Sequence, residues 1–95
     1  MSVVIVGGNE CMARRYKDLC GEFNCSAKVF TRMRDGLKNK FGNPDLLILF
    51  TNTASHKMIR FALSEAKESD MIIERSHSSS VSALKTILKR HTVKL

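Results

Sequence analysis

Four short apolar runs, separated by stretches with helical spacing, organise the whole chain. The runs are residues 3–6, 27–30, 46–50 and 71–73. The first and third are continuously apolar, as strands buried on both faces of a sheet are, whereas Lys28 interrupts the second, which is typical of a half-exposed edge strand. Strands that alternate with helices in this way predict an α/β domain with a parallel sheet.

Apolar residues between the runs recur at helical spacing and predict the helices. The three stronger stripes are Met12, Tyr16, Leu19, Cys20 and Phe23; Met58, Ile59, Ala62, Leu63 and Ala66; and Val81, Leu84, Ile87 and Leu88. Asn9 is the expected N-cap of the first helix, Thr53 or Ser55 that of the next strong helix, and a serine of the last loop that of the final helix. A weaker helix is expected between Asp35 and Phe41, ahead of a glycine and a proline.

The expected fold is a single small Rossmann-like α/β domain over residues 1–95, with three layers and a four-stranded parallel sheet in the order 2-1-3-4. Short strand–helix connections favour right-handed crossovers, which place helices on both faces of the sheet. This order puts the continuous run 46–50 at the centre and the alternating run 27–30 at an edge. A chain of 95 residues forms one domain.

Composition and charge narrow the classes of partner. The formal net charge is +7, which favours an anionic partner, although the basic residues are spread along the chain as on a solvated surface. Hydrophobic residues make up 43% and charged residues 26%, the ordinary globular balance. No apolar tract approaches the roughly 20 residues of a membrane span, and the N-terminus lacks the basic region of a signal peptide. We therefore expect a cytoplasmic chain without membrane contact, its three cysteines reduced.

The polar residues of greatest interest follow the strands. In an open parallel sheet, ligands bind at the carboxyl ends of the strands, near the point where strand order reverses. The two adjacent glycines after the first strand let backbone N–H groups approach an anion, or simply form a tight turn. The predicted ligand-binding residues are Gly7, Gly8, Asn9, Arg32, Thr51, Asn52, Thr53, Ser55, His56, Arg75, Ser76, His77, Ser78, Ser79 and Ser80.

Catalysis and zinc binding are both disfavoured by the sequence. It contains no arrangement of nucleophile, base and orienting group, so a non-catalytic domain is favoured. Cys11 and Cys20 would lie about 13 Å apart along one helix, whereas zinc–sulfur bonds are about 2.3 Å long. His91 ends the last helix and is interpreted as a favourable cation at a helix C-terminus.

Four segments together resemble a known family. They are Val4-Ile5-Val6-Gly7-Gly8, Asp45-Leu46-Leu47-Ile48, Thr51-Asn52-Thr53-Ala54-Ser55-His56 and Arg75-Ser76-His77-Ser78-Ser79-Ser80. Their order and spacing are similar to those of the bacterial domain-of-unknown-function 2325 family, over nearly the whole chain. The resemblance implies a small Rossmann-like domain without an established enzymatic activity. It also implies haem as a cofactor, with His77 as the candidate axial ligand, although Asn9 stands where the family often carries a histidine.

The favoured function is a non-catalytic ligand-binding or regulatory domain that binds a small anionic ligand at the carboxyl edge of the sheet. The ligand would be a nucleotide, a phosphate metabolite, or haem with its propionates near Arg32, Arg34 or Arg75. The alternative is a basic adaptor that binds nucleic acid or a partner protein. Nucleic acid is disfavoured because Tyr16 is the only tyrosine and tryptophan is absent, so the sequence lacks a stacking platform. The chain is also compatible with a homo-oligomer.

Overall fold

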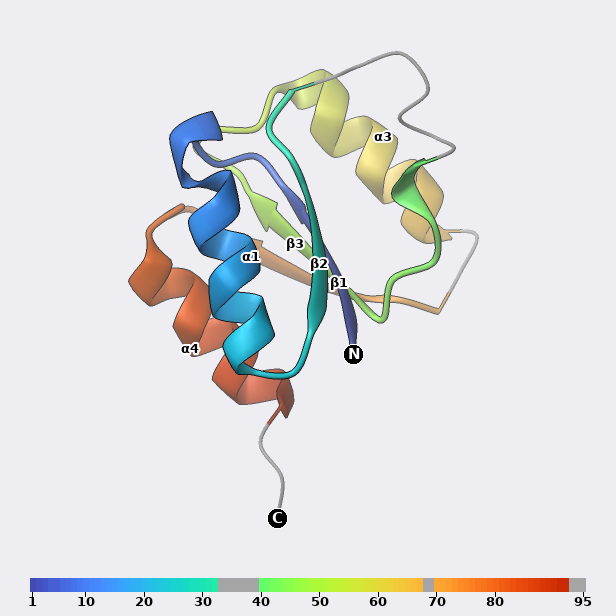
Figure 1. Ribbon diagram of the computed structural model, residues 1–95. Helices are drawn as coiled ribbons and strands as arrows, with labels where there is room; N and C mark the ends of the chain where they lie inside the picture. The colour runs from blue at the N-terminus through green and yellow to red at the C-terminus, as the bar shows by residue number, and fades with distance from the viewer. Residues whose placement is uncertain (33–39, 68–69, 93–95) are drawn as a thin grey trace.

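The computed structural model describes residues 1–32, 40–67 and 70–92, and its sheet is entirely parallel (Figure 1). The strands are β1 (Ser2–Val6), β2 (Ser26–Phe30), β3 (Leu46–Phe50) and β4 (Ile72–Ser76), in the order β2-β1-β3-β4. The helical elements are the 3-10 turn η1 (Glu10–Met12) and the helices α1 (Ala13–Glu22), α3 (His56–Lys67) and α4 (Val81–Thr92). The predicted α/β class and the 2-1-3-4 strand order are confirmed.

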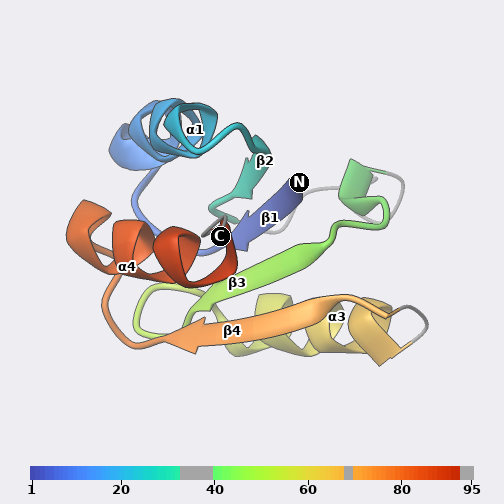
Figure 2. The ribbon, with the colours of Figure 1, turned by 90° about the horizontal axis from the view of Figure 1, so that it is seen from below.

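The sheet lies between helices on both of its faces. Helices α1 and α4 cover one face and α3 covers the other (Figures 1 and 2). Successive side chains of a strand point to opposite faces, so β1 and β3 supply both cores. Ile5 and Ile48 pack in the core beneath α1 and α4, whereas Val4 and Leu47 pack beneath α3. Every residue of β3 has an exposed fraction of 0%, which confirms its predicted central place.

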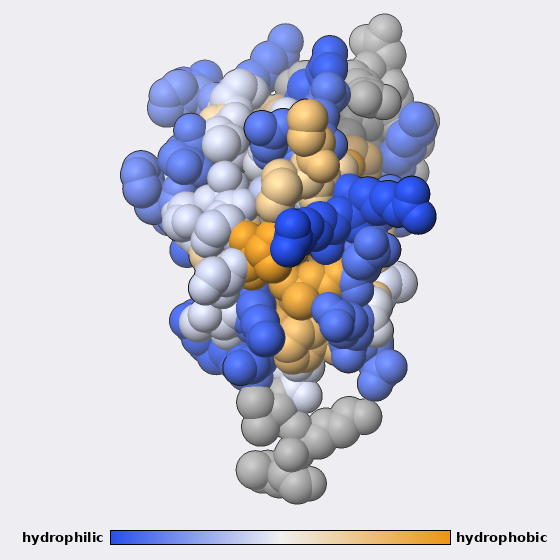
Figure 3. Space-filling model, turned by 60° about the vertical axis from the view of Figure 1, so that its left-hand side comes forward, coloured by the Kyte–Doolittle hydropathy of each residue, from blue (hydrophilic) through white to orange (hydrophobic). Residues whose placement is uncertain are grey.

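Helices α1 and α4 pack against each other as well as on the sheet. Tyr16 and Leu19 of α1 and Leu84 and Leu88 of α4 are buried in one core cluster. Figure 3 shows this side of the molecule, with apolar surface in a band near the middle and hydrophilic surface on either side. The apolar stripes predicted for these two helices therefore meet along a shared seam.

The two outer strands of the sheet are less buried than the inner ones. In β2 the side chains are partly buried or exposed, with Lys28 exposed in the middle, which confirms the predicted edge strand. In β4 the two large apolar residues Ile72 and Ile73 are 53% and 39% exposed. Because these neighbours point to opposite faces, β4 is exposed on both faces at its start.

Strand β4 extends further than its apolar run, and the boundary of residues 71–73 predicted for it is wrong. Met71 lies outside the strand, and the ladder continues beyond Ile73 through a charged stretch. An edge strand tolerates charged side chains because one of its sides faces solvent, so apolar character understates its length. The added pairs of the ladder are Ile48–Glu74, Leu49–Arg75 and Phe50–Ser76.

Polar side chains cap η1, α3 and α4 as predicted, whereas α1 continues from η1 and its N-cap Met12 forms no side-chain cap bond. Asn9 caps η1, since its side chain accepts a hydrogen bond from Cys11 N. Ser55 Oγ accepts from Met58 N at 3.2 Å at the start of α3. Ser80 Oγ accepts a similar bond at the start of α4, at 3.1 Å from the N–H of the third residue of that helix. These caps satisfy backbone donors that have no partner inside a helix.

The weaker helix predicted between Asp35 and Phe41 falls largely outside the described residues. Asp35 and Leu37 belong to the undescribed segment 33–39, and so does Arg34. Phe41 is buried at 1% exposure, as predicted, and its ring stacks on that of Phe30 with 6.1 Å between centroids. The start of this segment therefore has no structural description, while its end packs on the sheet.

No helix among the described residues is long and apolar enough to cross a lipid bilayer. Helices α3 and α4 have 12 residues each. At 1.5 Å per residue, each is about 18 Å long, against a hydrocarbon layer of about 30 Å.

Candidate functional site

Three loops that follow β1, β3 and β4 meet at the carboxyl edge of the sheet. These strands are neighbours in the sheet, and parallel strands end at the same edge, so the loops lie side by side. Of the predicted ligand-binding residues, Arg32 alone follows β2, at the outer side of this edge. We call the others the polar rim: Gly7, Gly8, Asn9, Thr51, Asn52, Thr53, Ser55, His56, Arg75, Ser76, His77, Ser78, Ser79 and Ser80.

Hydrogen bonds join the loops of the polar rim to one another. Thr51 N donates to the carbonyl of Ser76 at 2.9 Å, which links the loops after β3 and β4. Gly8 N donates to Thr53 Oγ1 at 2.6 Å, which links the loops after β1 and β3. The loops that were predicted to converge are therefore also connected to one another by hydrogen bonds.

Gly7 and Gly8 form a turn that only glycine accommodates. Their φ angles are +102° and +83°, in the region where other residues are strained. A Cβ at Gly7 would lie 2.9 Å from the carbonyl oxygen of Phe50, and a Cβ at Gly8 would lie 2.6 Å from Tyr16 Cε2. The turn geometry and close packing account for both glycines, so they do not by themselves indicate a phosphate site.

Tyr16 forms a hydrogen bond from the core to the loop between β4 and α4. Its side chain is 0% exposed, and its hydroxyl donates to the carbonyl of Ser79 at 2.6 Å. The sequence placed Tyr16 in the inner stripe of its helix without identifying this partner. A buried tyrosine hydroxyl requires an acceptor, which is the signal that could have pointed to such a contact.

The serine hydroxyls of the loop after β4 form hydrogen bonds within the loop and to the start of α4. Ser76 Oγ donates to the carbonyl of Ser78 at 2.7 Å, and Ser78 Oγ donates to Ser80 Oγ at 3.1 Å. Ser80 in turn caps α4. His77 stands exposed within this ordered loop. These serines therefore shape the loop and begin the helix, and the imidazole of His77 is exposed beside them.

The loop after β3 ends in the first turn of α3. Thr51, Asn52, Thr53 and His56 are all exposed, although Thr53 Oγ1 also donates to the carbonyl of Phe50 at 3.3 Å. Helix α3 and helix α4 both begin at the polar rim. The first backbone N–H groups of each helix and the positive ends of both helix dipoles therefore lie at this surface.

The two arginines predicted for the site have different surroundings. Arg75 lies opposite Leu49 in the ladder and is exposed at the end of β4. Arg32 Nε donates to Glu10 Oε1 at 2.7 Å, and the two residues form an ion pair. The charge of Arg32 is thus largely compensated by Glu10, which leaves Arg75 as the better-placed cation of the polar rim.

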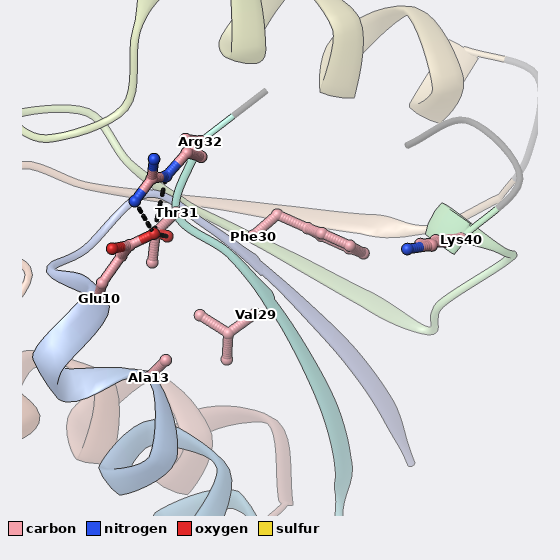
Figure 4. A pocket seen from close by; sticks show the side chains of 7 residues that line it. All are labelled: Glu10, Ala13, Val29, Phe30, Thr31, Arg32 and Lys40. Carbon is pink, nitrogen blue, oxygen red and sulfur yellow. Dashed lines mark hydrogen bonds and ion pairs between the residues drawn. The ribbon is translucent and has the colours of Figure 1, made fainter. Parts of the chain in front are cut away.

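A hollow lies beside β2, at the edge of the sheet. Its volume is about 430 Å³, and Arg32 is the only predicted site residue that lines it. Val29 points toward Ala13 of α1, while Phe30 points to the other side of the strand, toward Lys40 (Figure 4). This hollow therefore follows the edge strand and shares only Arg32 with the residues predicted to bind a ligand.

The described residues fit haem poorly. A porphyrin needs an apolar hollow with a ligand aimed into it, but His77 is exposed among hydroxyl-bearing neighbours. The two hollows described beside β2 have apolar residues in their lining and contain no histidine.

A charged cluster that the sequence did not predict joins β4 to the end of α4. His91 Nε2 lies 2.7 Å from Glu74 Oε1, and Arg90 donates to both carboxylate oxygens at 3.0 and 3.1 Å. The hydrogen bond with His91, followed by the bond and charge of Arg90, holds the pKa of Glu74 below its usual value. His91 thus has a specific partner in addition to its favourable place at a helix C-terminus.

The cysteines are free thiols, as predicted. Cys11 is exposed, whereas Cys20 and Cys25 are buried. Burial, with a smaller contribution from the neighbouring Cys25, raises the pKa of Cys20 to about 12. Cys20 is therefore a protonated core side chain at neutral pH.

Comparison with known proteins gives one family. A model described as "Uncharacterized protein conserved in bacteria (DUF2325)" matches residues 2–91. No curated protein and no solved structure matches the chain.

Proposed function

The chain belongs to the DUF2325 family of uncharacterised bacterial proteins, and we propose that it is a non-catalytic domain that binds a small anionic ligand at its polar rim. The ligand class that fits this surface best is a phosphate-bearing molecule such as a nucleotide. The polar rim offers donors and cations, which are the groups that recognise phosphate oxygens.

The observation that carries this proposal is that helices α3 and α4 both begin at the polar rim, beside the exposed side chain of Arg75. The bond from Thr51 N to Ser76 O holds the loops before α3 and α4 together. Arg75 directly precedes Ser76 and is exposed. Helix N-termini attract anions through their unpaired N–H groups and dipoles, and an arginine adds a full charge and a planar set of donors.

The partners of the rim hydroxyls support binding over catalysis. Ser78 and Ser80 bond to each other, and Ser55 and Ser80 cap helices. In the described residues, neither His56 nor His77 forms a hydrogen bond with a serine or a carboxylate. A nucleophile paired with its base is the arrangement that acyl-transfer catalysis needs.

Isothermal titration calorimetry with inorganic phosphate and with ADP tests the proposal. We expect saturable binding that Arg75→Ala weakens about tenfold, which corresponds to about 1.4 kcal/mol. His77→Ala should weaken it by a smaller factor. Arg14→Ala is the matched control, because Arg14 is an exposed arginine on α1, and it should leave the affinity within twofold.

Three results would contradict this function. One is a parent that binds neither phosphate nor ADP at millimolar concentration. Another is an equal loss of affinity in Arg75→Ala and Arg14→Ala, which would indicate a general effect of the basic surface. A haem absorption band that His77→Ala removes, in a protein indifferent to phosphate, would replace the phosphate-bearing ligand by haem.

A further inference from the structure

A groove with an apolar floor and a basic border runs along the outer side of β2. It consists of the hollow of about 430 Å³ and an adjoining one of about 310 Å³, and both are lined by Val29, Phe30 and Lys40. Ala13 borders the first hollow, and Lys17 of α1 and Lys28 of β2 border the second. The groove therefore follows the strand from its middle to its carboxyl end (Figure 4).

Within the described residues, the outer side of the β2 backbone pairs with no other strand and faces this groove. Ser26 N donates to Met1 O, and Phe30 O accepts from Gly7 N, so these two residues face β1. The N–H and C=O groups of alternate residues point to opposite sides of a strand, and β2 is an edge strand. Ala27 and Val29 consequently direct their backbone donors and acceptors outward, into the groove.

The border of the groove carries a positive charge that the described residues do not compensate. Lys17, Lys28 and Lys40 form no ion pair within residues 1–32, 40–67 and 70–92. Lys28 Nζ donates to the carbonyl of Lys40 at 3.0 Å, which holds two of these lysines near each other. At the carboxyl end the charge of Arg32 is balanced by Glu10. The groove is thus complementary to a negatively charged occupant.

We propose that this groove binds an acidic segment of a partner protein, in extended conformation, as an additional strand beside β2. Such a segment pairs its backbone with Ala27 and Val29, as peptides do when they extend an open sheet. This is a protein-binding form of the adaptor function that the basic charge suggests, and it is independent of the polar rim.

The two faces of β2 specify which side chains the segment presents. Val29 lies on the α1 face with Ala13, whereas Phe30 lies on the opposite face. Lys28 shares the face of Phe30 because side chains alternate along a strand. An added strand therefore places apolar residues against Val29 and acidic residues beside Lys28 and Lys40. Alternating valine and glutamate satisfies both faces.

An extended peptide fits these features better than a single-stranded nucleic acid. Nucleic acid binding without sequence preference relies on aromatic faces for base stacking. The aromatic residue of the groove is Phe30, and one face of its ring is covered by Phe41 at an interplanar angle of 11°. Outward-directed backbone N–H and C=O groups are instead the partners that a peptide backbone needs.

Fluorescence anisotropy with a labelled ten-residue peptide of alternating glutamate and valine tests the proposal. We expect Lys28→Glu to weaken binding at least tenfold. Lys85→Glu, which makes the same change of net charge on α4, should weaken it less than twofold. Arg75→Ala should leave it unchanged, so that failure here is distinguishable from failure of the phosphate site.

Two N-methylated peptides separate strand addition from simple charge attraction. Methylation of every second amide in one frame removes the donors that pair with β2 and should abolish binding, whereas methylation in the other frame should preserve it. In the complex, amide exchange at Ala27 and Val29 should slow. Equal binding of both methylated peptides, equal loss in Lys28→Glu and Lys85→Glu, or displacement by a single-stranded DNA oligomer with unchanged amide exchange would each overturn the proposal.

Discussion

The hydroxyl of Tyr16 in α1 donates a hydrogen bond to the backbone carbonyl of Ser79, 63 residues away in the sequence, at 2.6 Å. The ring of Tyr16 also packs against that of Phe50 in β3, with 5.4 Å between centroids. One buried side chain of α1 thus connects this helix to the central strand and to the loop before α4. The position of the serine-rich loop depends on this contact.

Tyr16→Phe is predicted to destabilise the domain by about 1–2 kcal/mol, because it leaves the carbonyl of Ser79 without its donor. The ring and its packing remain, so the protein should still fold. Urea denaturation measures the change. Amide exchange in residues 76–80 should also accelerate relative to β3. A variant as stable as the parent, with unchanged exchange, would mean that water replaces the hydroxyl at no cost.

Gly8→Ala is predicted to cost at least about 2 kcal/mol, because it combines a positive φ with a close contact to Tyr16. Gly21→Ala is the matched control. Gly21 lies in α1, and a Cβ there would meet nothing within 4 Å. Alanine at that position should stabilise the protein by about 0.5 kcal/mol. Thermal denaturation of the two variants should therefore shift in opposite directions, and a stable Gly8→Ala protein would refute the turn geometry.

The interaction of Glu74 with His91 and Arg90 predicts a loss of stability in acid. The folded protein lowers the pKa of Glu74 below its ordinary value of 4.5, so the stabilisation is complete above that pH and is lost as the pH falls through the lowered value. Glu74→Gln should cost about 1 kcal/mol at pH 7, the upper range for a partly exposed ion pair. The difference from the parent should shrink below pH 4.5.

Denaturant titrations at several pH values between about 2.5 and 7 measure the difference in free energy of unfolding between the parent and Glu74→Gln. Glu22→Gln controls for the loss of one carboxylate, since Glu22 is exposed on α1. A difference between parent and Glu74→Gln that stays constant down to the lowest pH would show that the carboxylate charge does not stabilise the fold.

The sheet could be predicted because its strongest signals are local. The continuous run Leu46–Phe50 has no solvent-facing side, and its 0% exposure follows directly from that pattern. Lys28 marked β2 as an edge for the same reason. The extent of β4 could not be read in this way, because Glu74 and Arg75 are held in the strand by ladder pairs with β3 that no local pattern encodes.

The location of the candidate site at the carboxyl edge of the sheet could be predicted, but its side-chain contacts could not. Strand order alone brings the polar rim together, and order follows from the chain topology. The pairs Tyr16–Ser79, Glu10–Arg32 and Glu74–His91 join residues distant in sequence. Each depends on the relative placement of two elements, which a single sequence does not specify. The groove beside β2 escaped prediction for the same reason.

Thiol reactivity provides the last prediction. Cys11 is exposed, while Cys20 and Cys25 are buried and burial raises the pKa of Cys20 to about 12. The thiolate is the reactive form, so Cys20 should be unreactive in the folded protein at pH 8. Titration with a disulfide reagent should give one fast equivalent in the native state and three after unfolding, in keeping with three free cysteines. Cys11→Ser should remove the fast phase. A fast equivalent that remains in that variant would mean that the core opens at the end of α1 more readily than its packing indicates.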